Sequence, residues 1–434
     1  MNILSKYAHL ITYKGGFYLF NVATNTVIAL NQSLYNLIEL NKEKIDTLRY
    51  IHPDLYAGME SCGAIVPDSK DESSELISKF EALDNDPSTF GITINPTLDC
   101  NLRCWYCYET HGKGTIMSSE VKESVKRLID KKLADVRIKH LDVSFFGGEP
   151  LLGWDKVIIP ILKYASEECA ARGVILKSSF TTNGVLLSDS RFDELIHLGL
   201  GDSMFQISID GNKTLHDISR VNAAKHPTYD KIMYNVTLGA SKGFKIALRF
   251  NYTPENLDTY ADVLTDLVSL PDVTRKNISC SFHQVWQTVK SRSGEDIKNK
   301  EDRLSTLFRS RGLTTYSDRI FQRYVCYGDR ANHVVVNYNG DLYKCTAREF
   351  MPSTREGNIT NQGDLVWNNR YLHRMSVKYA NVVCKNCSIM PICNGGCAQN
   401  KLERSISEGC PMGKDHDERI NYLLMALNQK LLQQ

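Results

Sequence analysis

The sequence has almost no net charge and no long apolar segment. Its 434 residues include 52 lysines and arginines against 50 aspartates and glutamates, which leaves a formal net charge of +2. So small a charge creates no strong field to attract nucleic acid or a membrane surface, and we expect neither as a partner. The N-terminal segment MNILSKYAHLITYKGG lacks the apolar core and cleavage site of a signal peptide, and no apolar run is long enough to span a bilayer. These absences predict a cytoplasmic protein.

The sequence also lacks the even-numbered disulfide framework of a short secreted chain. It has 13 cysteines, an odd number, and most of them gather near residue 100 or between residues 326 and 410. In a reducing compartment, clustered thiols favour ligation of a metal or an iron–sulfur cluster. Cys62, Cys169 and Cys280 stand apart from both groups, and we expect them to be small buried apolar side chains.

The chain divides into three stretches, of which the first is residues 1–88. Its apolar pattern predicts three strands, a helical segment, a short apolar run and a charged linker that contains an amphipathic helix. These elements are expected at 9–13, 17–21, 26–30, 34–48, 63–67 and 68–88, in that order. The stretch therefore reads as a small mixed domain joined to the rest of the chain by a helical linker.

The second stretch, residues 89–317, alternates strands with helices. The strands are expected at 90–97, 140–148, 174–184, 203–211, 245–253 and 277–286. A helix at 118–132 is capped by Ser118 or Ser119, and another is expected at 154–171. Repeated βα units predict a parallel sheet or barrel, whose ligands bind at the carboxyl ends of the strands. The third stretch, 318–434, is rich in cysteine and glycine and weakly periodic, as expected where metal ligands replace an apolar core.

The first cysteine group directly follows the first strand of the second stretch. It reads Cys100-x3-Cys104-x2-Cys107, and three thiolates so spaced can hold three irons of a cubane cluster. The fourth iron stays open to a small chelating cofactor, such as the amine and carboxylate of S-adenosylmethionine (SAM), whose carbon–sulfur bond an electron from the cluster can cleave. The alternative is a zinc site with a fourth ligand elsewhere, such as His111.

This loop, with an aromatic Tyr106 before its last cysteine, resembles the signature of the radical SAM superfamily. The resemblance implies an α/β fold built on a partial (βα)6 barrel, in agreement with the count of βα units. It also implies that Tyr106 lies near the adenine of SAM. Further positions that resemble the family's SAM contacts are Gly147-Gly148-Glu149-Pro150, like its GGEP motif, and Thr182, Asn183, Ser208 and Arg220 near the ribose or carboxylate.

The glycines and the acid of the GGEP-like motif have a physical reason to be there. We expect Gly147 and Gly148 to let backbone carbonyls approach the ligand, because glycine has no Cβ. Glu149 is expected to pair with the ammonium group of SAM, since a carboxylate and an ammonium form a charge-assisted hydrogen bond. Taken alone, an acid in such a turn is more often an exposed turn residue, and its position after a strand favours the functional interpretation.

The second cysteine group resembles the SPASM pattern, which in its family holds two auxiliary [4Fe–4S] clusters. The spacing is Cys326-x13-Gly340-x4-Cys345, then Cys384-x2-Cys387-x5-Cys393-x3-Cys397, then Cys410. The resemblance assigns Cys384, Cys387, Cys393 and Cys410 to an outer cluster, and Cys326, Cys345 and Cys397 to an inner one. With the SAM-binding cluster, three [4Fe–4S] clusters are expected. The alternative is a structural zinc module.

The inner cluster lacks one expected ligand. The eight-cysteine form of the pattern has another cysteine shortly before the position of Cys326, and this sequence does not. The inner cluster is therefore expected to have an open iron or an unassigned ligand, and Cys280 is not assigned to it.

SPASM enzymes act mainly on peptides and proteins, and two subclasses fit the sequence to different degrees. Anaerobic sulfatase maturases, which make formylglycine, carry an Asp directly after the cysteine that corresponds to Cys345. Here Thr346 occupies that position, so this activity is disfavoured. The other subclass crosslinks ribosomally made peptides, and the segments 344–348 and 387–397 resemble it more closely.

The N-terminal stretch supports the second subclass. Strands followed by helices resemble the winged-helix element that captures a leader peptide as an extra strand. The alternative is a domain that merely covers the open barrel.

The sequence thus predicts a radical SAM peptide maturase with an N-terminal winged-helix-like domain and a C-terminal SPASM domain. Its 5′-deoxyadenosyl radical would abstract a hydrogen from a side chain of a precursor peptide, which leads to an intramolecular carbon–carbon (cyclophane) or thioether crosslink. The expected partners are the precursor with its leader and a reducing donor of the flavodoxin or ferredoxin type. No catalytic base is assigned, although Arg348 and Glu349 adjoin Cys345. Other classes left open are a formylglycine-generating enzyme, a non-catalytic iron–sulfur electron carrier and a zinc-stabilised binding module.

Overall fold

The computed structural model describes residues 1–222, 224–288, 294–315, 326–403 and 409–432. The chain forms two compact units, each of which joins segments that are distant in the sequence. The first unit consists of Met1–Asp86, Arg319–Ala331 and Leu372–Gln434, and the second of Pro87–Asp318 and Asn332–Tyr371. The first unit therefore contains both ends of the chain, whereas the sequence motifs divide the chain into three consecutive stretches. None of the helices in the described ranges is long and apolar enough to cross a membrane.

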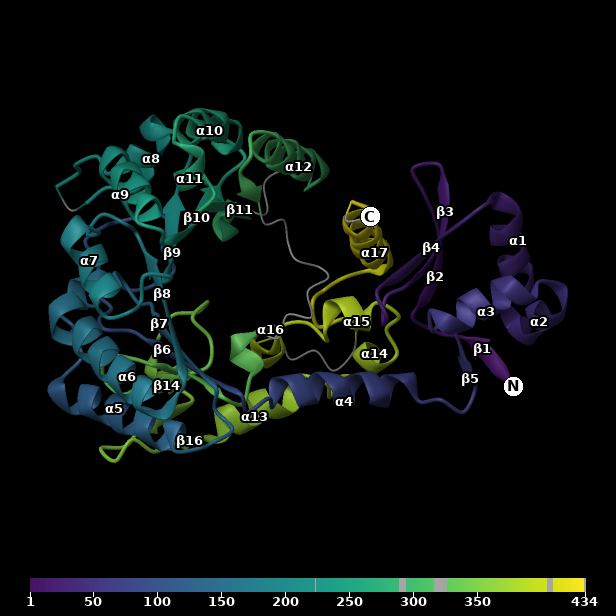
Figure 1. Cartoon of the computed structure of the whole chain (residues 1–434), viewed down its shortest axis with the longest axis horizontal. Coiled ribbons are helices and arrows are strands. Elements are labelled where there is room, and N and C mark those ends of the chain that lie inside the picture. The colour runs from purple at the N-terminus through teal and green to yellow at the C-terminus, as the bar shows by residue number, and fades with distance from the viewer. Residues whose placement is uncertain (223, 289–293, 316–325, 404–408, 433–434) are drawn as a thin grey trace. The chain divides into compact units, whose positions relative to one another are not determined.

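The second unit is built on parallel strands that follow one another in chain order. All six strands expected between residues 90 and 286 are present, and each pairs in parallel with the next. They are β6 (Thr89–Ile94), β7 (His140–Phe145), β8 (Ile175–Thr182), β9 (Met204–Ile209), β10 (Lys245–Tyr252) and β11 (Ile278–Gln284), with a short β12 (Thr314–Thr315) at the edge. The predicted partial (βα)6 barrel is thereby confirmed (Figure 1).

Helices cover one side of these strands. They are α5 (Ser119–Leu133), α6 (Ile159–Arg172), α7 (Asp189–His197), α8 (Lys213–Ser219), α9 (Tyr229–Ser241), α10 (Tyr260–Val268), α11 (Asp272–Arg275) and α12 (Gly294–Ser310). Ser118, not Ser119, caps α5, because its side chain accepts a hydrogen bond from the N–H of Val121. The outward strand residues and the inner faces of these helices form one continuous apolar core.

The helix expected at 154–171 begins with a π-helical turn. The turn covers Trp154–Ile158 and leads into α6, whose second residue is Pro160. Proline has no N–H to donate to the carbonyl four residues earlier, so that carbonyl of Lys156 is left without its helical partner. The ammonium group of Lys122 donates to it instead, at 3.1 Å. The sequence pattern predicted the helix but not the change of helix type.

Aromatic side chains tie the central strands together. Phe145, Phe180 and Phe205 occupy paired positions on β7, β8 and β9. Their rings stack with centroid distances of 5.2 and 4.7 Å. Stacked cross-strand pairs fix the register, because a slip by one residue would turn each ring to the opposite face of the sheet.

The other face of the barrel strands is polar and partly open. Polar side chains alternate with the buried apolar ones along each strand, as the period of two requires. Those of Ser144 and Ser179 are hydrogen-bonded across neighbouring strands at 2.8 Å. The remaining half-buried members of this polar face include Asp142, Thr181, Gln206, Ser208, Arg249, Ser281 and His283. An inner face of this kind is suited to a polar ligand rather than to a packed apolar core.

Part of the cysteine-rich stretch continues the barrel sheet. Strand β13 (His333–Val336) pairs in parallel with β6. It is followed by the antiparallel strands β14 (Asp341–Tyr343), β15 (Gly357–Ile359) and β16 (Leu365–Trp367). The hairpin places Cys345 just beyond β14, in the same unit as the first cysteine group.

The first unit contains a three-stranded antiparallel sheet. The strands expected at 9–13, 17–21 and 26–30 are β2 (Ala8–Tyr13), β3 (Gly16–Asn21) and β4 (Thr26–Leu30), while β1 (Asn2–Leu4) pairs with β5 (Ile65–Pro67). The helices are α1 (Gln32–Asn41), α2 (Leu48–Ile51), α3 (Pro53–Ser61), α4 (Glu72–Asp84), α14 (Val382–Lys385), α15 (Met390–Cys393), α16 (Ala398–Glu403) and α17 (His416–Leu431). Helix α13 (Asn369–Val377) bridges the two units in sequence.

Both faces of this sheet are covered. Leu19 and Ala8 pack with the buried side chains of α1 to α3 on one face. On the other face, Ile11 and Phe20 pack with Phe80 of α4 and with apolar residues of α15 and α17. The N-terminal strands and the C-terminal helices therefore share one core, although more than 300 residues separate them in the sequence.

A buried charged group joins the same two ends. The ammonium of Lys378 lies 2.9 and 2.7 Å from the two carboxylate oxygens of Asp84, at the end of α4, and 3.3 Å from Asp329. The hydroxyl of Tyr379 also bonds Asp84, at 3.1 Å. Such charges are stable in an interior only when they are paired.

We predict that Asp84→Ala lowers the free energy of unfolding by about 3–5 kcal/mol, because it leaves Lys378 buried with one carboxylate instead of two. Urea unfolding monitored by circular dichroism measures the change. The matched control is Glu81→Ala, an exposed acid on the same helix, which should change stability by less than about 0.5 kcal/mol. Equal effects of the two variants would contradict the importance of the buried pair.

Candidate functional site

The first cysteine loop begins one residue beyond β6 and is shaped by its own hydrogen bonds. The hydroxyl of Thr97 accepts from the N–H of Asp99 at 2.9 Å, and the Asp99 carboxylate accepts from the N–H groups of Cys100 and Gly114 at 2.8 and 2.9 Å. These bonds close the segment into a compact turn. Cys100 is buried, whereas Cys104 is half-buried and Cys107 is exposed. The three thiols therefore extend from the interior of the barrel to its surface.

Gly147 and Gly148 follow β7 and lie directly against this loop. A Cβ on Gly147 would lie 2.4 Å from the carbonyl oxygen of Thr97, and a Cβ on Gly148 would lie 2.4 Å from that of Asp99. Gly147 also has a φ of +114°, which other residues rarely adopt. The glycines are thus required for the approach of two backbone turns, a reason different from the close approach to a ligand that we expected.

Glu149 is fully buried and joins its own turn to the end of β8. Its Oε1 accepts from the hydroxyl of Thr182 at 2.7 Å and from the N–H of Leu151 at 3.0 Å, and its Oε2 accepts from the N–H of Asn183 at 2.8 Å. Burial raises the pKa of this carboxyl, and the three hydrogen bonds oppose that rise. A carboxylate can accept about four hydrogen bonds, so a further donor such as an ammonium fits its remaining valence.

Asn183 connects the carboxylate to the thiols. Its amide nitrogen lies 3.9 Å from the sulfur of Cys100 and 2.7 Å from the side-chain oxygen of Asn101. The structure therefore brings Cys100, Glu149, Thr182 and Asn183 to one place, the carboxyl edge of β6 to β8. Pro150 is buried beside them, at the start of a 3₁₀ turn over Pro150–Gly153.

Tyr106 and Arg220 belong to a second polar group, at the ends of β9 and β10. The Tyr106 hydroxyl accepts from Arg220 at 2.7 Å and from the Asn251 amide at 3.1 Å. Asp210 lies 3.7 Å from the Arg220 guanidinium and accepts from Asn251 at 3.3 Å. Ser208 lies on β9, two residues before Asp210. The predicted residues Tyr106 and Arg220 are therefore in contact.

Asp210 and Asn251 were missed by the sequence analysis. Asp210 directly follows β9 and Asn251 is the penultimate residue of β10, at the carboxyl edge where ligands bind in such barrels, and that position was the available signal. Burial raises the pKa of the Asp210 carboxyl, and the positive charge of Arg220 opposes the rise.

Arg249 and His283 stand on the polar inner face of β10 and β11. Arg249 donates to the side-chain oxygen of Asn251 at 3.0 Å, and Nε2 of His283 lies 3.1 Å from the hydroxyl of Ser281. Burial, followed by the nearby Arg249 charge, lowers the pKa of His283 to about 4. His283 is therefore neutral at physiological pH.

The segments that follow Cys107 and Cys345 contact each other. The hydroxyl of Tyr108 donates to the carbonyl of Thr346 at 2.7 Å, and the N–H of Thr110 donates to the Glu349 carboxylate at 3.2 Å. Arg348 lies over the ring of Trp286 at 5.6 Å.

A second acid lies close to Glu349. Glu109 is 9% exposed, and its Oε2 has no hydrogen-bond partner among the described residues. Burial, with a smaller contribution from the Glu349 charge, raises the pKa of Glu109 to about 8. Glu109 was not singled out from the sequence, which gives no signal for its burial.

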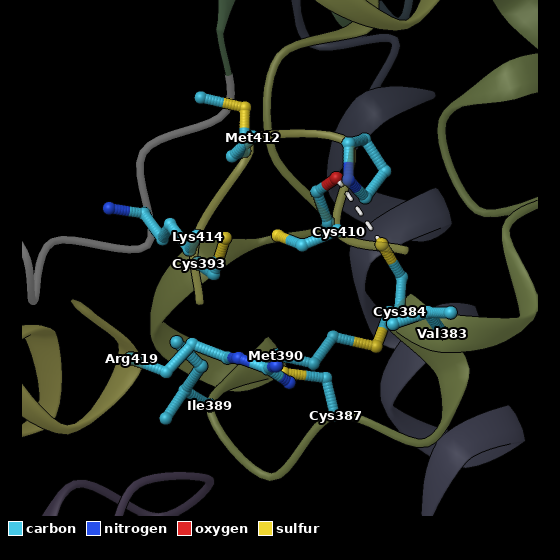
Figure 2. A pocket seen from close by; sticks show the side chains of 12 residues that line it. Val383, Cys384, Cys387, Ile389, Met390, Cys393, Cys410, Met412, Lys414 and Arg419 are labelled. Carbon is cyan, nitrogen blue, oxygen red and sulfur yellow. Dashed lines mark hydrogen bonds between the residues drawn. The ribbon is translucent and has the colours of Figure 1, made fainter. Parts of the chain in front are cut away.

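The first unit carries the candidate outer cluster site. Cys384, Cys387, Cys393 and Cys410 line a single cavity, and Figure 2 shows their side chains arranged around it. Within the described ranges, no group of three or more Cys, His, Asp or Glu side chains is placed so that it could hold a single metal ion, these four thiols included.

The donor set of this cavity fits an iron–sulfur cluster. Four thiolates around a [4Fe–4S] core carry net negative charge. Lys414 and Arg419 also line the cavity. Burial raises the pKa of the Cys384 thiol, and the positive charge of the nearby Lys401 opposes that rise. These cations offset the charge of the thiolates.

The three predicted ligands of the inner cluster belong to different units. Cys326 and Cys397 lie in the first unit, and Cys345 in the second. All three thiols are half-buried. Their assignment to one cluster stays a prediction. Cys62, Cys169 and Cys280 are buried, as expected for apolar core residues.

Comparison with known proteins agrees with this arrangement. Residues 94–267 match the family profile of the Radical SAM superfamily. The serine-type anaerobic sulfatase-maturating enzyme of Bacteroides thetaiotaomicron is 25% identical over 382 residues, which cover 76% of this chain and 85% of that protein.

Two solved structures share the fold. A sulfatase maturase, titled native anSMEcpe with bound AdoMet and Kp18Cys peptide, has a TM-score of 0.59 at 20% identity and covers 79% of this chain and 99% of its own. Streptococcus suis SuiB bound to its precursor peptide SuiA has a TM-score of 0.52 at 15% identity and covers 94% of this chain and 98% of its own. At these identities the likeness is one of fold.

We predict that Glu149→Ala destabilises the second unit by about 3 kcal/mol or more, because three buried donors lose their acceptor. Glu149→Gln should cost less, since one side-chain oxygen remains. Thermal unfolding measures both, and Glu167→Ala, an exposed acid on α6, is the control. If the alanine and glutamine variants melt like the control, Glu149 does not tie the strand ends together.

The pKa of His283 predicts a dependence of stability on pH. The folded state holds this imidazole neutral down to about pH 4, whereas in the unfolded chain it gains a proton below its ordinary pKa of 6.5. Because the unfolded state then binds more protons, the free energy of unfolding falls as pH drops from 6.5 towards 4, by about 1–3 kcal/mol. Urea titrations at pH 7, 6 and 5 should show a shallower fall in His283→Asn than in His226→Asn, an exposed control. Parallel curves would contradict the assignment.

Proposed function

We propose that the chain, whose residues 94–267 match the Radical SAM superfamily, is a maturase that crosslinks side chains within a ribosomally made precursor peptide. The observation that supports this best is the carboxyl edge of the barrel, where the Cys100 thiol, the Glu149 carboxylate and the polar group around Tyr106 meet the open inner face. The site where the radical would form is then adjacent to the polar inner face of the barrel strands, which suits a peptide substrate.

Some residues of the second unit would hold the cofactors, and others form the polar inner face of the barrel strands. Cys100, Cys104 and Cys107 would hold a [4Fe–4S] cluster, and Glu149 has the remaining acceptor capacity for the ammonium of SAM. When both are bound, an electron from the reduced cluster releases the 5′-deoxyadenosyl radical from SAM. Ser208, Arg249 and His283 present hydrogen-bonding groups on this polar inner face, as a peptide backbone requires.

The proposed reaction removes two hydrogens from the peptide. The adenosyl radical takes one as an atom, a carbon–carbon or carbon–sulfur bond closes, and the second hydrogen leaves as a proton and an electron. Glu349 is the candidate proton acceptor, because it lies where the segments after Cys107 and Cys345 contact each other. The inner SPASM cluster is the candidate electron acceptor, and a flavodoxin or ferredoxin supplies the electron for SAM.

A peptide substrate with a leader is supported by both units. SuiB, whose fold covers 94% of this chain, was solved with its precursor peptide, whereas the sulfatase maturase fold covers 79%. The three-stranded sheet of the first unit has β4 at one edge, and among the described residues no backbone group outside the sheet bonds to Thr26–Leu30. An unpaired edge accepts an extended peptide as a further strand.

Sulfatase maturation is the second candidate function, because the relative from Bacteroides thetaiotaomicron has that activity in its name. The position after Cys345 argues against it. Thr346 has a hydroxyl side chain, which is not a base at neutral pH, and its carbonyl already accepts from Tyr108. A sulfatase-derived peptide that contains the modified Ser or Cys distinguishes the two functions, since only a maturase of that class converts it to an aldehyde.

We predict that anaerobically purified protein with dithionite cleaves SAM to 5′-deoxyadenosine, and that replacing Cys100, Cys104 and Cys107 together by Ala abolishes cleavage. Liquid chromatography of the nucleoside measures the rate, which should rise when the precursor peptide is added. The matched control replaces Cys62 and Cys169, two buried thiols outside both groups, by Ala. Cleavage that survives in the triple variant would show that the radical arises elsewhere.

Leader capture predicts a local change in hydrogen exchange. Adding the leader segment of that peptide should slow amide exchange in Thr26–Leu30 at least about tenfold, because the edge amides gain hydrogen bonds. The buried central strand Gly16–Asn21 is the internal control and should change little. Tight binding without protection of either edge strand of this sheet would contradict capture by strand addition.

A further inference from the structure

Side chains of the N-terminal segment bond the backbone of the loop that carries Cys387. The ammonium of Lys6 and the hydroxyl of Ser73 lie 3.2 and 2.6 Å from the carbonyl oxygen of Lys385. Nε2 of His9 lies 3.2 Å from the carbonyl oxygen of Ser388. These two carbonyls stand on either side of Cys387. The loop therefore receives its external hydrogen bonds from residues that precede it by more than 300 positions.

The loop between Cys384 and Cys387 has little internal support. Asn381 caps the four-residue helix α14 by accepting from the N–H of Cys384 at 3.1 Å, and the N–H of Cys387 donates to the carbonyl of Cys384 at 3.1 Å. A helix of one turn is not stable by itself, so its conformation depends on what packs against it.

The same segment supplies the apolar cover of the loop. Ile389 and Met390, which follow Cys387, are 4% and 1% exposed and pack in the core that contains Tyr7, Ile11 and Phe20. One sheet face thus lies against the chain between the second and third thiols of the outer site. The loop carbonyls are bonded by His9 on that face, by Lys6 just before β2 and by Ser73 on α4, while the apolar side chains of the face bury the next two residues.

We propose that the N-terminal sheet is part of the outer cluster site, and that Lys6, His9 and Ser73 are positioning residues that fix the Cys384–Cys387 loop for iron–sulfur ligation. The proposal rests on the assignment of the four cavity thiols to a cluster under the proposed function. With the donors in place, the two thiols are held in the orientation in which they line the cavity. Without them, the loop samples orientations that release the cluster more easily.

This inference changes the role of the N-terminal segment. A domain that only captures leaders, or only covers the barrel, has no reason to bond the backbone beside a cluster ligand. Because one sheet provides both β4, a free edge, and β2, the strand that carries His9, peptide capture and cluster retention share a structural element.

The test uses full-length protein in which Cys100, Cys104 and Cys107 are Ala, so that only auxiliary clusters contribute iron. Into this background we introduce Lys6→Ala, His9→Ala and Ser73→Ala together. We expect release of iron to a ferrous chelator about tenfold faster for one cluster, corresponding to about four irons per chain, and an altered electron paramagnetic resonance spectrum of the reduced protein. The matched control, Lys79→Ala with Ser78→Ala, changes an exposed lysine and an exposed serine on α4, and should behave like the background.

Two further variants decide between explanations. Lys6→Arg with Ser73→Thr keeps both donors to the Lys385 carbonyl and should restore slow iron release. Equal release rates from this double variant and from the triple alanine variant would overturn the proposal. Release at the background rate from the triple alanine variant would also overturn it. Cys384→Ala gives the iron content without the outer cluster. If it does not lower iron, the cluster assignment itself is wrong. If it does and the alanine variant keeps its iron, only the positioning role fails.

Discussion

The carboxyl edge of the barrel depends on the close approach of two backbone turns, the cysteine loop after β6 and the Gly147–Gly148 turn after β7. A single Cβ on either glycine would lie 2.4 Å from a loop carbonyl, so any other residue forces the turns apart. Their contact fixes the position of Glu149. Two hydrogen bonds to its carboxylate, from Thr182 and Asn183, then bring the end of β8 next to the thiol of Cys100. The cysteine loop is thus held by the close packing of two backbone turns, which leaves no space for a side chain at positions 147 and 148.

The first unit follows a different rule, because its stability comes from joining the two chain ends. Within this unit, the N-terminal sheet and helices α1 to α3 form only a small core, and small domains need additional support. Here the support is the shared core with α15 and α17 and the buried pair of Asp84 and Lys378. Removing the N-terminal segment would therefore expose the C-terminal helices and leave Lys378 with one carboxylate, Asp329, instead of two. Point variants at the sheet surface separate leader capture from structural support more cleanly than a truncation.

The elements and the barrel were predictable from the sequence because they depend on local patterns. Six strands with period-two alternation, helices with serine caps and turns with glycine each leave a signature within about ten residues. The cysteine motifs were visible for the same reason, since their ligand spacing is short. The gathering of the four thiols Cys384, Cys387, Cys393 and Cys410 around one cavity agrees with the outer-cluster assignment that the SPASM resemblance implied.

What the sequence did not reveal depends on contacts between distant segments. Asp210 and Asn251 meet Tyr106 only once β9 and β10 lie side by side, and the burial of Glu109 depends on a segment that follows Cys345. The role of Lys6 and His9 needs a loop more than 300 residues away. The glycines at 147 and 148 were singled out from a motif, and the physical reason that the structure gives for them is the neighbouring backbone. No local pattern carries such information.

The central claim is that a radical formed at the cysteine loop acts directly on a peptide side chain. The most direct measurement incubates the anaerobic protein with SAM and its precursor peptide, synthesised with perdeuterated residues, and examines the nucleoside product by mass spectrometry. We predict that 5′-deoxyadenosine acquires one deuterium from the peptide and that the peptide loses this deuterium together with one further hydrogen or deuterium. Unlabelled 5′-deoxyadenosine alongside a modified peptide, or labelled nucleoside alongside a sulfatase-type aldehyde, would contradict the account.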